Sequence, residues 1–262
     1  MMKGKNAIVT GVANGIGAEV AKMLSAKGIK VTGLDIIETH DNIERFIKLD
    51  LSDPKSINSA AELINEDINI LCNIAGLPPR DGLQAKILKV NFLGTRYLTQ
   101  RLMDQLVNGA AVINVASRAG AFWQENIEQV KSFLALPEDA ETESFCAEND
   151  IDSVRAYNLS KEAIIAWTIA ETEKSIARGI RFNTVSPGAV ATGILDDFMS
   201  AFGERASKNI ARVGRPASAE DVAKVILFLA GPGSQWLRGI DITVDGGMAA
   251  LNAGDMLGLN IS

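Results

Sequence analysis

Apolar residues recur along the chain in two alternating patterns. Short apolar runs bounded by turn residues predict buried strands over residues 5–10, 30–34, 45–49, 68–74, 111–115, 180–185 and 240–244. Between them, apolar residues spaced three or four positions apart predict helices over residues 15–26, 82–107, 154–178 and 218–230. A further helix is expected to be capped near Ser52 or Asp53, with Pro54 in its first turn.

This alternation predicts the fold class. Repeated strand–helix units indicate an α/β, Rossmann-like, doubly wound parallel sheet with helices on both faces. Composition does not change along residues 1–262, and a chain that is 47% apolar can bury a full core, so one domain is expected. Ligands bind such sheets at the carboxyl ends of the strands, which is where the chemistry is expected.

The first strand ends in a glycine-rich turn. Gly11, Gly15 and Gly17 follow Thr10, and the predicted helix starts at Gly15. Glycines let the backbone approach a pyrophosphate closely, and a helix N-terminus offers unpaired N–H groups and partial positive charge. The turn therefore predicts the phosphate-binding start of a dinucleotide site; an ordinary strand-to-helix turn is the simpler alternative.

Asp35 favours the dinucleotide interpretation and indicates which dinucleotide binds. It ends the second predicted strand, 18 residues after Gly17, where an acid is expected to meet the adenine ribose hydroxyls. A 2′-phosphate there would face a like charge and would need a basic neighbour. Because Asn14, Ile36 and Ile37 are not basic, NAD is predicted as the cofactor rather than NADP.

Tyr157 and Lys161 form a candidate acid–base pair. They lie four residues apart in a predicted helix, so their side chains share one face. A phenol has an ordinary pKa of about 10 and is a poor catalyst at neutral pH. A nearby cation favours the phenolate, so Lys161 is expected to lower the pKa of Tyr157.

Composition and charge count against several other classes. A net charge of −6 without a basic run makes nucleic acid an unexpected partner, and no apolar stretch approaches the ~20 residues of a membrane span. No signal segment precedes the first strand, so a cytoplasmic enzyme is expected. Cys72 and Cys146 lack metal-site spacing, and His40, the one histidine, lies in a polar loop. Neither a metal site nor a Ser-His-Asp hydrolase is predicted.

Taken together, the motifs resemble the short-chain dehydrogenase/reductase family from residue 5 to about residue 248. The matching motifs are Thr10-Gly11-x-x-x-Gly15-x-Gly17, Asn73-x-Ala75-Gly76, Asn91, Ser117, Tyr157-x-x-x-Lys161, Pro187-Gly188 and Asp245-Gly246-Gly247. The usual second Asn before Ala75 is absent, since positions 72 and 74 hold Cys72 and Ile74. That departure falls on backbone-packing positions.

The resemblance implies roles for four catalytic residues. Ser117 would stabilise the substrate oxygen, and Tyr157 would exchange a proton with it. Lys161, together with a positive nicotinamide, would lower the pKa of Tyr157 and bind the nicotinamide ribose, while Asn91 would anchor a water in a proton relay. The resemblance also implies that NAD is held by Gly11, Asn14, Gly15, Ile16, Gly17, Asp35, Asp50, Leu51, Asn73, Ala75, Gly76, Tyr157, Lys161, Pro187, Gly188, Val190 and Thr192.

Two departures in length point to a branch of the family. Asn91 comes only 15 positions after Gly76, whereas Tyr157 comes 40 positions after Ser117. Residues 118–152 carry nine acids and two bases and are predicted to be a helical insertion, with Ile127, Val130 and Leu134 on its packed face and a second helix starting at Pro137. This shape resembles bacterial 3-alpha-hydroxysteroid dehydrogenase/carbonyl reductase and coniferyl alcohol dehydrogenase. That resemblance implies a homodimer through residues 218–230 and the last strand, with a homotetramer as the other expected assembly; an acidic interaction platform is the competing interpretation of the insertion.

The substrate is expected to be a hydrophobic alcohol or carbonyl. Residues 189–213 contain an apolar series that suits a lid over a steroid, terpenoid or aromatic alcohol, namely Val190, Ile194, Leu195, Phe198, Met199 and Phe202. Phe122 and Trp123 would add aromatic surface. No arginine clamp for a carboxylate or phosphate is evident, with Arg80, Arg118 and Arg212 as the candidate exceptions. The alternatives are a 3-oxoacyl-carrier-protein reductase and a non-catalytic dinucleotide-sensing protein.

Overall fold

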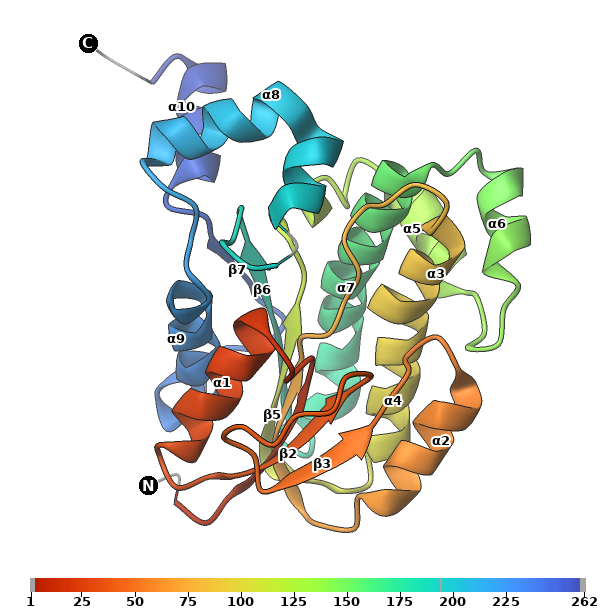
Figure 1. Cartoon of the computed structure of the whole chain (residues 1–262), viewed down its shortest axis with the longest axis vertical. Coiled ribbons are helices and arrows are strands. Elements are labelled where there is room, and N and C mark those ends of the chain that lie inside the picture. Colours follow the sequence, from red (N-terminus) through yellow and green to blue (C-terminus); the bar gives the residue numbers. More distant parts are fainter. Residues whose placement is uncertain (1–2, 194, 260–262) are drawn as a thin grey trace.

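A parallel sheet of seven strands forms the centre of the computed structural model, which describes residues 3–193 and 195–259. Its strand order is β3-β2-β1-β4-β5-β6-β7, so the order reverses direction between β1 and β4 (Figure 1). The strands are β1 Asn6–Thr10, β2 Lys30–Asp35, β3 Arg45–Lys48, β4 Ile68–Asn73, β5 Leu106–Val115, β6 Arg181–Pro187 and β7 Asp241–Val244. The predicted α/β doubly wound fold is confirmed.

Helices cover both faces of the sheet (Figure 1). On one face lie α1 Gly15–Ser25 and α9 Ala219–Ala230; on the other lie α2 Pro54–Leu63, α3 Gln84–Leu88, α4 Thr95–Leu102 and α7 Ser153–Ile176. Asp53 caps α2 by accepting from the Lys55 backbone N–H at 2.9 Å, and Ser218 and Asp221 form a capping box at α9. The cap predicted near Ser52 or Asp53 is therefore present, and the helix predicted from residue 218 begins with a cap of its own.

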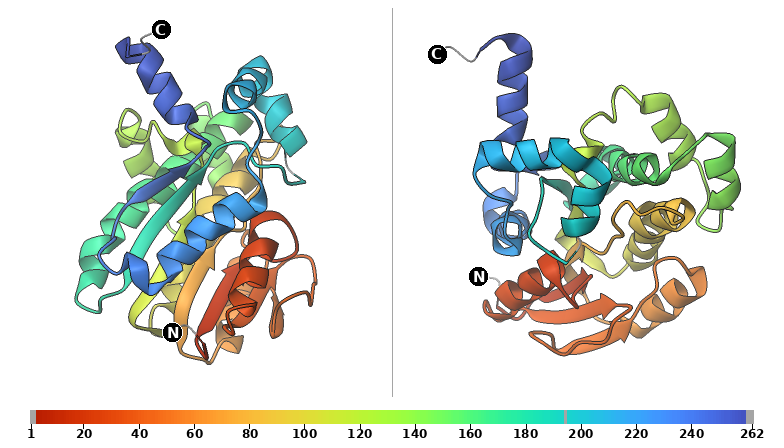
Figure 2. Two further views of the ribbon diagram at one scale, coloured as in Figure 1. Left: turned by 90° about the vertical axis from the view of Figure 1, so that its left-hand side faces the viewer. Right: turned by 45° about the horizontal axis from the view of Figure 1, so that its top comes forward.

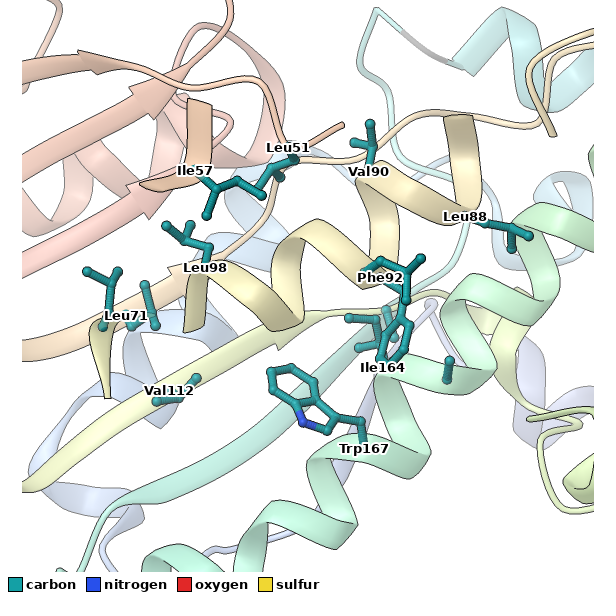
Figure 3. Packing of buried hydrophobic residues seen from close by; sticks show 14 of the residues in the cluster. Leu51, Ile57, Leu71, Leu88, Val90, Phe92, Leu98, Val112, Ile164 and Trp167 are labelled. Atoms are coloured by element: carbon teal, nitrogen blue, oxygen red, sulfur yellow. The ribbon is translucent and has the colours of Figure 1, made fainter. Parts of the chain in front are cut away.

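Alternation along the strands fills two cores. In β1, Ile8 points to the cluster beneath α2, α4 and α7, whereas Ala7 and Val9 point to the cluster beneath α1 and α9. Figure 3 shows the first cluster, in which the Phe92 ring lies 6.2 Å from that of Trp167 on α7. The helix that carries Tyr157 and Lys161 is thus fixed to the sheet by buried aromatic packing.

The predicted helix over residues 82–107 is wrong in two respects. Its middle is a π-helical segment, η1 Lys89–Gly94, between α3 and α4, and its last residues belong to β5. A π turn leaves the apolar periodicity nearly unbroken, so the pattern does not reveal it. The early start of β5 was hidden because Asn108 and Gly109 interrupt the apolar run at an irregularity in the β4–β5 pairing.

The predicted insertion is helical and has one packed face. It contains the short turn η2 Arg118–Gly120, α5 Ile127–Leu134 and α6 Thr142–Glu148. The Phe133 ring of α5 lies 5.1 Å from Phe92 and 5.6 Å from Phe145 of α6, so both helices join the core. The predicted helix start at Pro137 is wrong: Pro137 begins a turn closed by the Ala140 N–H at 3.2 Å, and α6 starts at Thr142.

Two helices complete the described chain above the carboxyl ends of the strands. The predicted lid is α8 Leu195–Val213, which is kinked at Gly203, and α10 Met248–Leu257 projects beside it (Figure 2). No helix was predicted after residue 248. Within the described residues, none of the helices combines the length and apolar character needed to cross a bilayer.

Candidate active site

Ser117, Tyr157 and Lys161 meet at the end of β5. Ser117 lies two residues beyond the end of the strand, and its side chain is hydrogen-bonded to that of Tyr157. One helical turn beyond Tyr157, the Lys161 Nζ lies 5.7 Å from the phenol ring centroid and donates to the Val115 carbonyl at 3.0 Å. The structure therefore brings together three of the four residues predicted to be catalytic.

Burial governs the electrostatics of this group. It lowers the pKa of Lys161 to about 8. Burial also raises the pKa of Tyr157 above its ordinary value, and the hydrogen bond with Ser117 opposes that rise. The prediction that Lys161 lowers the pKa of Tyr157 is thus not met by the protein groups alone, because desolvation of the phenol outweighs the favourable contacts.

Asn91, the fourth predicted catalytic residue, lies in the π-helical segment and is buried. Its Oδ1 accepts from the Leu77 N–H at 2.7 Å, and its Nδ2 donates to the Leu77 carbonyl at 3.0 Å and to Ser160 Oγ at 3.2 Å. Asn91 therefore holds the segment after β4 against α7. Its predicted part in a proton relay stays a prediction.

A buried chain of polar side chains fixes β4 and β5 beneath the site. Asn73 Nδ2 donates to Thr99 Oγ1 at 2.9 Å and to Asn114 Oδ1 at 2.8 Å, and Asn114 Nδ2 donates to Thr168 Oγ1 at 2.9 Å. Thr168 belongs to the same helix as Tyr157. Asn73 thus supports the central sheet, and its predicted contact with NAD stays a prediction.

The glycine turn after β1 is closely packed. Gly11 has φ +76°, a conformation that favours glycine. A Cβ at Gly17 would lie 2.0 Å from the Gly11 carbonyl oxygen, so only glycine lets the start of α1 approach the turn this closely. Thr10 Oγ1 accepts from the N–H groups of Ile74 and Ala75, at 2.9 and 3.0 Å. These two hydrogen bonds join the glycine turn to the residues that follow β4, beside Gly76.

Two acids, Asp35 and Asp50, lie at the carboxyl ends of β2 and β3. Asp35 Oδ2 accepts from the Ala13 N–H at 3.0 Å, and its Oδ1 accepts from the Ile37 N–H at 3.0 Å. Asp35 thus faces the glycine turn, next to Asn14. Burial alone would raise the pKa of Asp50, but hydrogen bonds from Ser52 and the charge of Lys86 bring it below its ordinary value. Leu51, beside it, is buried.

A cavity of about 80 Å³ joins the glycine turn to the Ser117 group. Nine of the predicted site residues line it: Ile16, Gly76, Ser117, Tyr157, Lys161, Pro187, Gly188, Val190 and Thr192. The other predicted cofactor residues lie along the carboxyl ends of β1 to β4 and not on this cavity. Val190 is held in place by a parallel bridge to Ala217.

A larger chamber of about 900 Å³ shares Ser117, Pro187 and Gly188 with the small cavity. Its apolar wall includes Phe122, the lid residues Met199, Phe202, Ile210 and Val213, and Met248 and Met256 of α10. The Ser117 hydroxyl therefore lies where a predominantly apolar chamber meets the small cavity.

The sequence interpretation missed the contribution of α10. Met248, Asn252 and Met256, spaced four residues apart, all line the chamber, and that spacing is the signal that would have indicated a helix face. Trp123 does not line the chamber; it packs against the main core, because the turn after η2 points it inward. Ile194 and the Phe198 side chain lie outside the described residues.

Two family models match the chain in succession. Residues 5–128 match the short chain dehydrogenase model, and residues 140–249 match a model described as enoyl-(acyl carrier protein) reductase. The residues between the two matches lie within the helical insertion.

Similarity to known proteins extends over nearly the whole chain. The coniferyl-alcohol dehydrogenase of Pseudomonas sp. strain HR199 is 36% identical over 248 residues, covering 94% of this chain and 97% of that protein. The 3-alpha-hydroxysteroid dehydrogenase/carbonyl reductase of Comamonas testosteroni is 28% identical, covering 93% and 96%. The structure of the 3-alpha-hydroxysteroid dehydrogenase from Pseudomonas sp. B-0831 complexed with NADH superposes with a TM-score of 0.84 at 29% identity, covering 95% and 98%. With the Ser–Tyr–Lys group in place at the strand ends, these similarities show that the chain belongs to the short-chain dehydrogenase/reductase family and is an oxidoreductase acting on an alcohol or a carbonyl.

Proposed function

We propose that this enzyme uses NAD(H) to interconvert a hydrophobic alcohol, aromatic or steroid-like, and its carbonyl. One observation carries the proposal: Ser117, Tyr157 and Lys161 line the small cavity at the strand ends, and Ser117 also lines the apolar chamber. A dinucleotide that runs along the carboxyl ends of the strands would bring its nicotinamide end to this group, and the chamber would hold an apolar substrate.

The residues present fit a dinucleotide. Gly17 approaches Gly11 closely, and the Asn14 side chain makes no capping hydrogen bond at the start of α1, so the first N–H groups of this helix would be available to a pyrophosphate. Asp35, at the end of β2, would bind the adenine ribose hydroxyls and disfavour a 2′-phosphate. Bound NAD(H) would supply the hydride acceptor or donor. Val190 and Thr192, which line the small cavity, would contact its nicotinamide end.

Ser117 and Tyr157 would act on the substrate oxygen. In the reducing direction, Tyr157 donates its hydroxyl proton to the carbonyl oxygen, while the Ser117 hydroxyl stabilises the negative charge that develops there. In the oxidising direction, the phenolate accepts the alcohol proton. Their mutual hydrogen bond holds both oxygens toward one point.

Lys161 would stabilise the phenolate. Its pKa of about 8 leaves it mostly protonated at neutral pH, with its charge 5.7 Å from the phenol ring. The contact with the Val115 carbonyl holds the ammonium in that place. Asn91, joined to Ser160 one residue before Lys161, keeps this turn of α7 aligned.

The chamber supports a hydrophobic substrate. Aromatic, methionine and branched side chains form most of its apolar wall, and two similar proteins are named for an aromatic alcohol and for hydroxysteroids. Both substrate types bury a large apolar body and present one reacting oxygen. This is the property that we propose the enzyme selects.

A turnover panel tests the proposal. Coniferyl alcohol, an aliphatic secondary alcohol, a hydroxysteroid and an acyl-carrier-protein thioester are assayed with NAD(H) and with NADP(H). We expect turnover of a ring-bearing alcohol with NAD. Preference for the thioester with NADPH would support the alternative 3-oxoacyl-carrier-protein reductase, and binding of NADH without any turnover would support the alternative dinucleotide sensor.

A further inference from the structure

The arginines around the chamber differ in how fully they are paired. Arg212 donates to Asp255 at 2.6 Å and to Asn252 at 3.3 Å, and Arg215 donates to Asp221 at 2.7 Å. Their side chains are 37% and 64% exposed, so water reaches their remaining donors. Arg118 differs from both in its hydrogen bonding and in its exposure to solvent.

Arg118 directly follows Ser117 and lines the chamber. Its side chain is 28% exposed, and its Nε lies 3.3 Å from Oδ2 of Asp245, whose side chain is 4% exposed. The Asp245 carboxylate already accepts from the Gly247 and Ala249 N–H groups, at 2.9 and 2.8 Å. The ion pair therefore fixes the guanidinium beside the catalytic serine.

Within residues 3–193 and 195–259, Arg118 forms this ion pair, but its guanidinium makes no hydrogen bond. A guanidinium has five N–H donors in a planar fork. Donors that face a partly desolvated chamber without an acceptor are costly. An acceptor on a bound molecule would remove that cost.

The charges around the chamber decide what kind of acceptor fits. The charged residues of its wall are all paired: Arg118 with Asp245, Arg215 with Asp221, and Asp255 with Arg212. Asp241 also lies close enough to Arg118 to interact with its charge. Arg118 is thus neutralised as a charge while it keeps its donors, which favours a neutral oxygen over a carboxylate or phosphate.

We propose that Arg118 is a specificity-determining residue that donates hydrogen bonds to a second, neutral oxygen of the substrate. That oxygen is a phenol, ether or ketone oxygen on an otherwise apolar molecule, apart from the oxygen that reacts beside Ser117. The proposal rests on the proposed function and deepens it: the enzyme selects apolar alcohols that carry a further acceptor.

Matched substrate pairs test this proposal. Coniferyl alcohol is compared with cinnamyl alcohol, which lacks the ring oxygens, and androsterone is compared with its analogue without the ring ketone. Arg118→Met is expected to lower kcat/KM roughly 10- to 100-fold for the oxygenated member of the pair that is turned over, and less than about threefold for the other. Arg118→Lys keeps the positive charge but not the planar fork of donors. Its kcat/KM for the oxygenated member is expected to lie between those of Arg118→Met and the unaltered enzyme.

Arg215→Met is the control, because it removes another chamber arginine at the solvent side. It is expected to change both members of a pair by equal factors. An equal loss for both members in Arg118→Met would overturn the proposal and leave Arg118 as a support for Asp245. A larger loss for an added carboxylate-bearing analogue would overturn the choice of a neutral oxygen. Failure of the unaltered enzyme on all four alcohols would instead reject the proposed function, and this inference with it.

Discussion

The Lys161 ammonium lies 5.7 Å from the ring centroid of Tyr157 and donates to the Val115 carbonyl at 3.0 Å. The last residue of β5, Val115, therefore positions the cation, and the helix sets its distance from the phenol. Both groups are buried, so a change in the charge of one affects the other strongly.

Tyr157→Phe should abolish proton exchange. Loss of a general acid–base group is expected to lower kcat roughly a hundredfold to ten-thousandfold, while NADH affinity stays nearly unchanged. Steady-state kinetics and NADH fluorescence titration measure the two effects. Tyr97→Phe is the matched control, because Tyr97, the only other tyrosine, donates to Asn58 at 2.8 Å away from the site. It should keep its kcat and lose about 1 kcal/mol of stability. Substantial turnover by Tyr157→Phe would assign the proton to another group.

The pKa of Lys161 predicts how stability depends on pH. The folded chain releases this proton near pH 8, whereas an unfolded chain holds it until about 10.5. Between these values the unfolded state binds more protons, so the free energy of unfolding should rise with pH relative to that of Lys161→Met. The whole gain is at most about 3 kcal/mol. Urea unfolding of both proteins from pH 7 to 10 measures it, and parallel curves would contradict the depressed pKa.

Asp35→Ala should weaken the preference for NAD over NADP. Removing a charged hydrogen-bond acceptor is expected to lower the ratio of the two kcat/KM values by about tenfold or more. Asp35→Asn removes the negative charge but keeps the size of the side chain and one acceptor for the Ala13 or Ile37 N–H. It therefore distinguishes an effect of charge from an effect of lost contacts. An unchanged ratio in both variants would remove Asp35 from cofactor recognition.

Most of the sheet could be predicted because parallel strands buried on both faces leave uninterrupted apolar runs. The strands from β1 to β7 all appear close to their predicted bounds, apart from the early start of β5. The π-helical segment could not be predicted in this way because it keeps a helical periodicity. The helix after Gly247 lies largely exposed beyond the core, so its signal is limited to the four-residue spacing of Met248, Asn252 and Met256.

The site could be predicted in part for a related reason. Gly11 and Ser117 lie just beyond the ends of β1 and β5, so their positions follow from the fold, whereas Tyr157 was identified by its spacing to Lys161 in one helix. The pKa of Tyr157 does not follow from its spacing to Lys161, because burial of the phenol depends on residues far apart in the chain. The free donors of Arg118 depend in the same way on Asp245, which is remote in sequence.

We propose that the predicted homodimer forms through α9 and β7. Phe228 of α9 is 49% exposed, and Trp236 and Ile240, between α9 and β7, are 91% and 39% exposed, so three large apolar side chains would be available to an interface. Trp236→Glu is expected to yield monomers in size-exclusion chromatography with light scattering. Met256→Glu, equally drastic on the exposed end of α10, is the control and should stay a dimer. Dissociation by Met256→Glu alone would place the interface on α10.

An ion pair joins α8, the predicted lid, to the opposite side of the site. Arg80, in the loop after β4, donates to Asp197 Oδ1 from Nε at 3.2 Å and from Nη2 at 2.9 Å, and to Oδ2 at 2.9 Å. Asp197 lies in the first turn of α8. The bidentate geometry favours a defined closed position of the lid, but Arg80 is 60% exposed, so solvent screens the pair. Its contribution is therefore limited to about 1 kcal/mol.

Arg80→Met and Asp197→Asn should each raise KM up to about fivefold without lowering kcat, because they favour the open lid and leave Ser117, Tyr157 and Lys161 in place. If the pair acts as a unit, the double variant should resemble each single variant, since the second change removes nothing further. Additive effects on KM would show that the two side chains act separately. Limited proteolysis within α8 is the independent measurement, and cleavage should be faster in all three variants than in the unaltered chain.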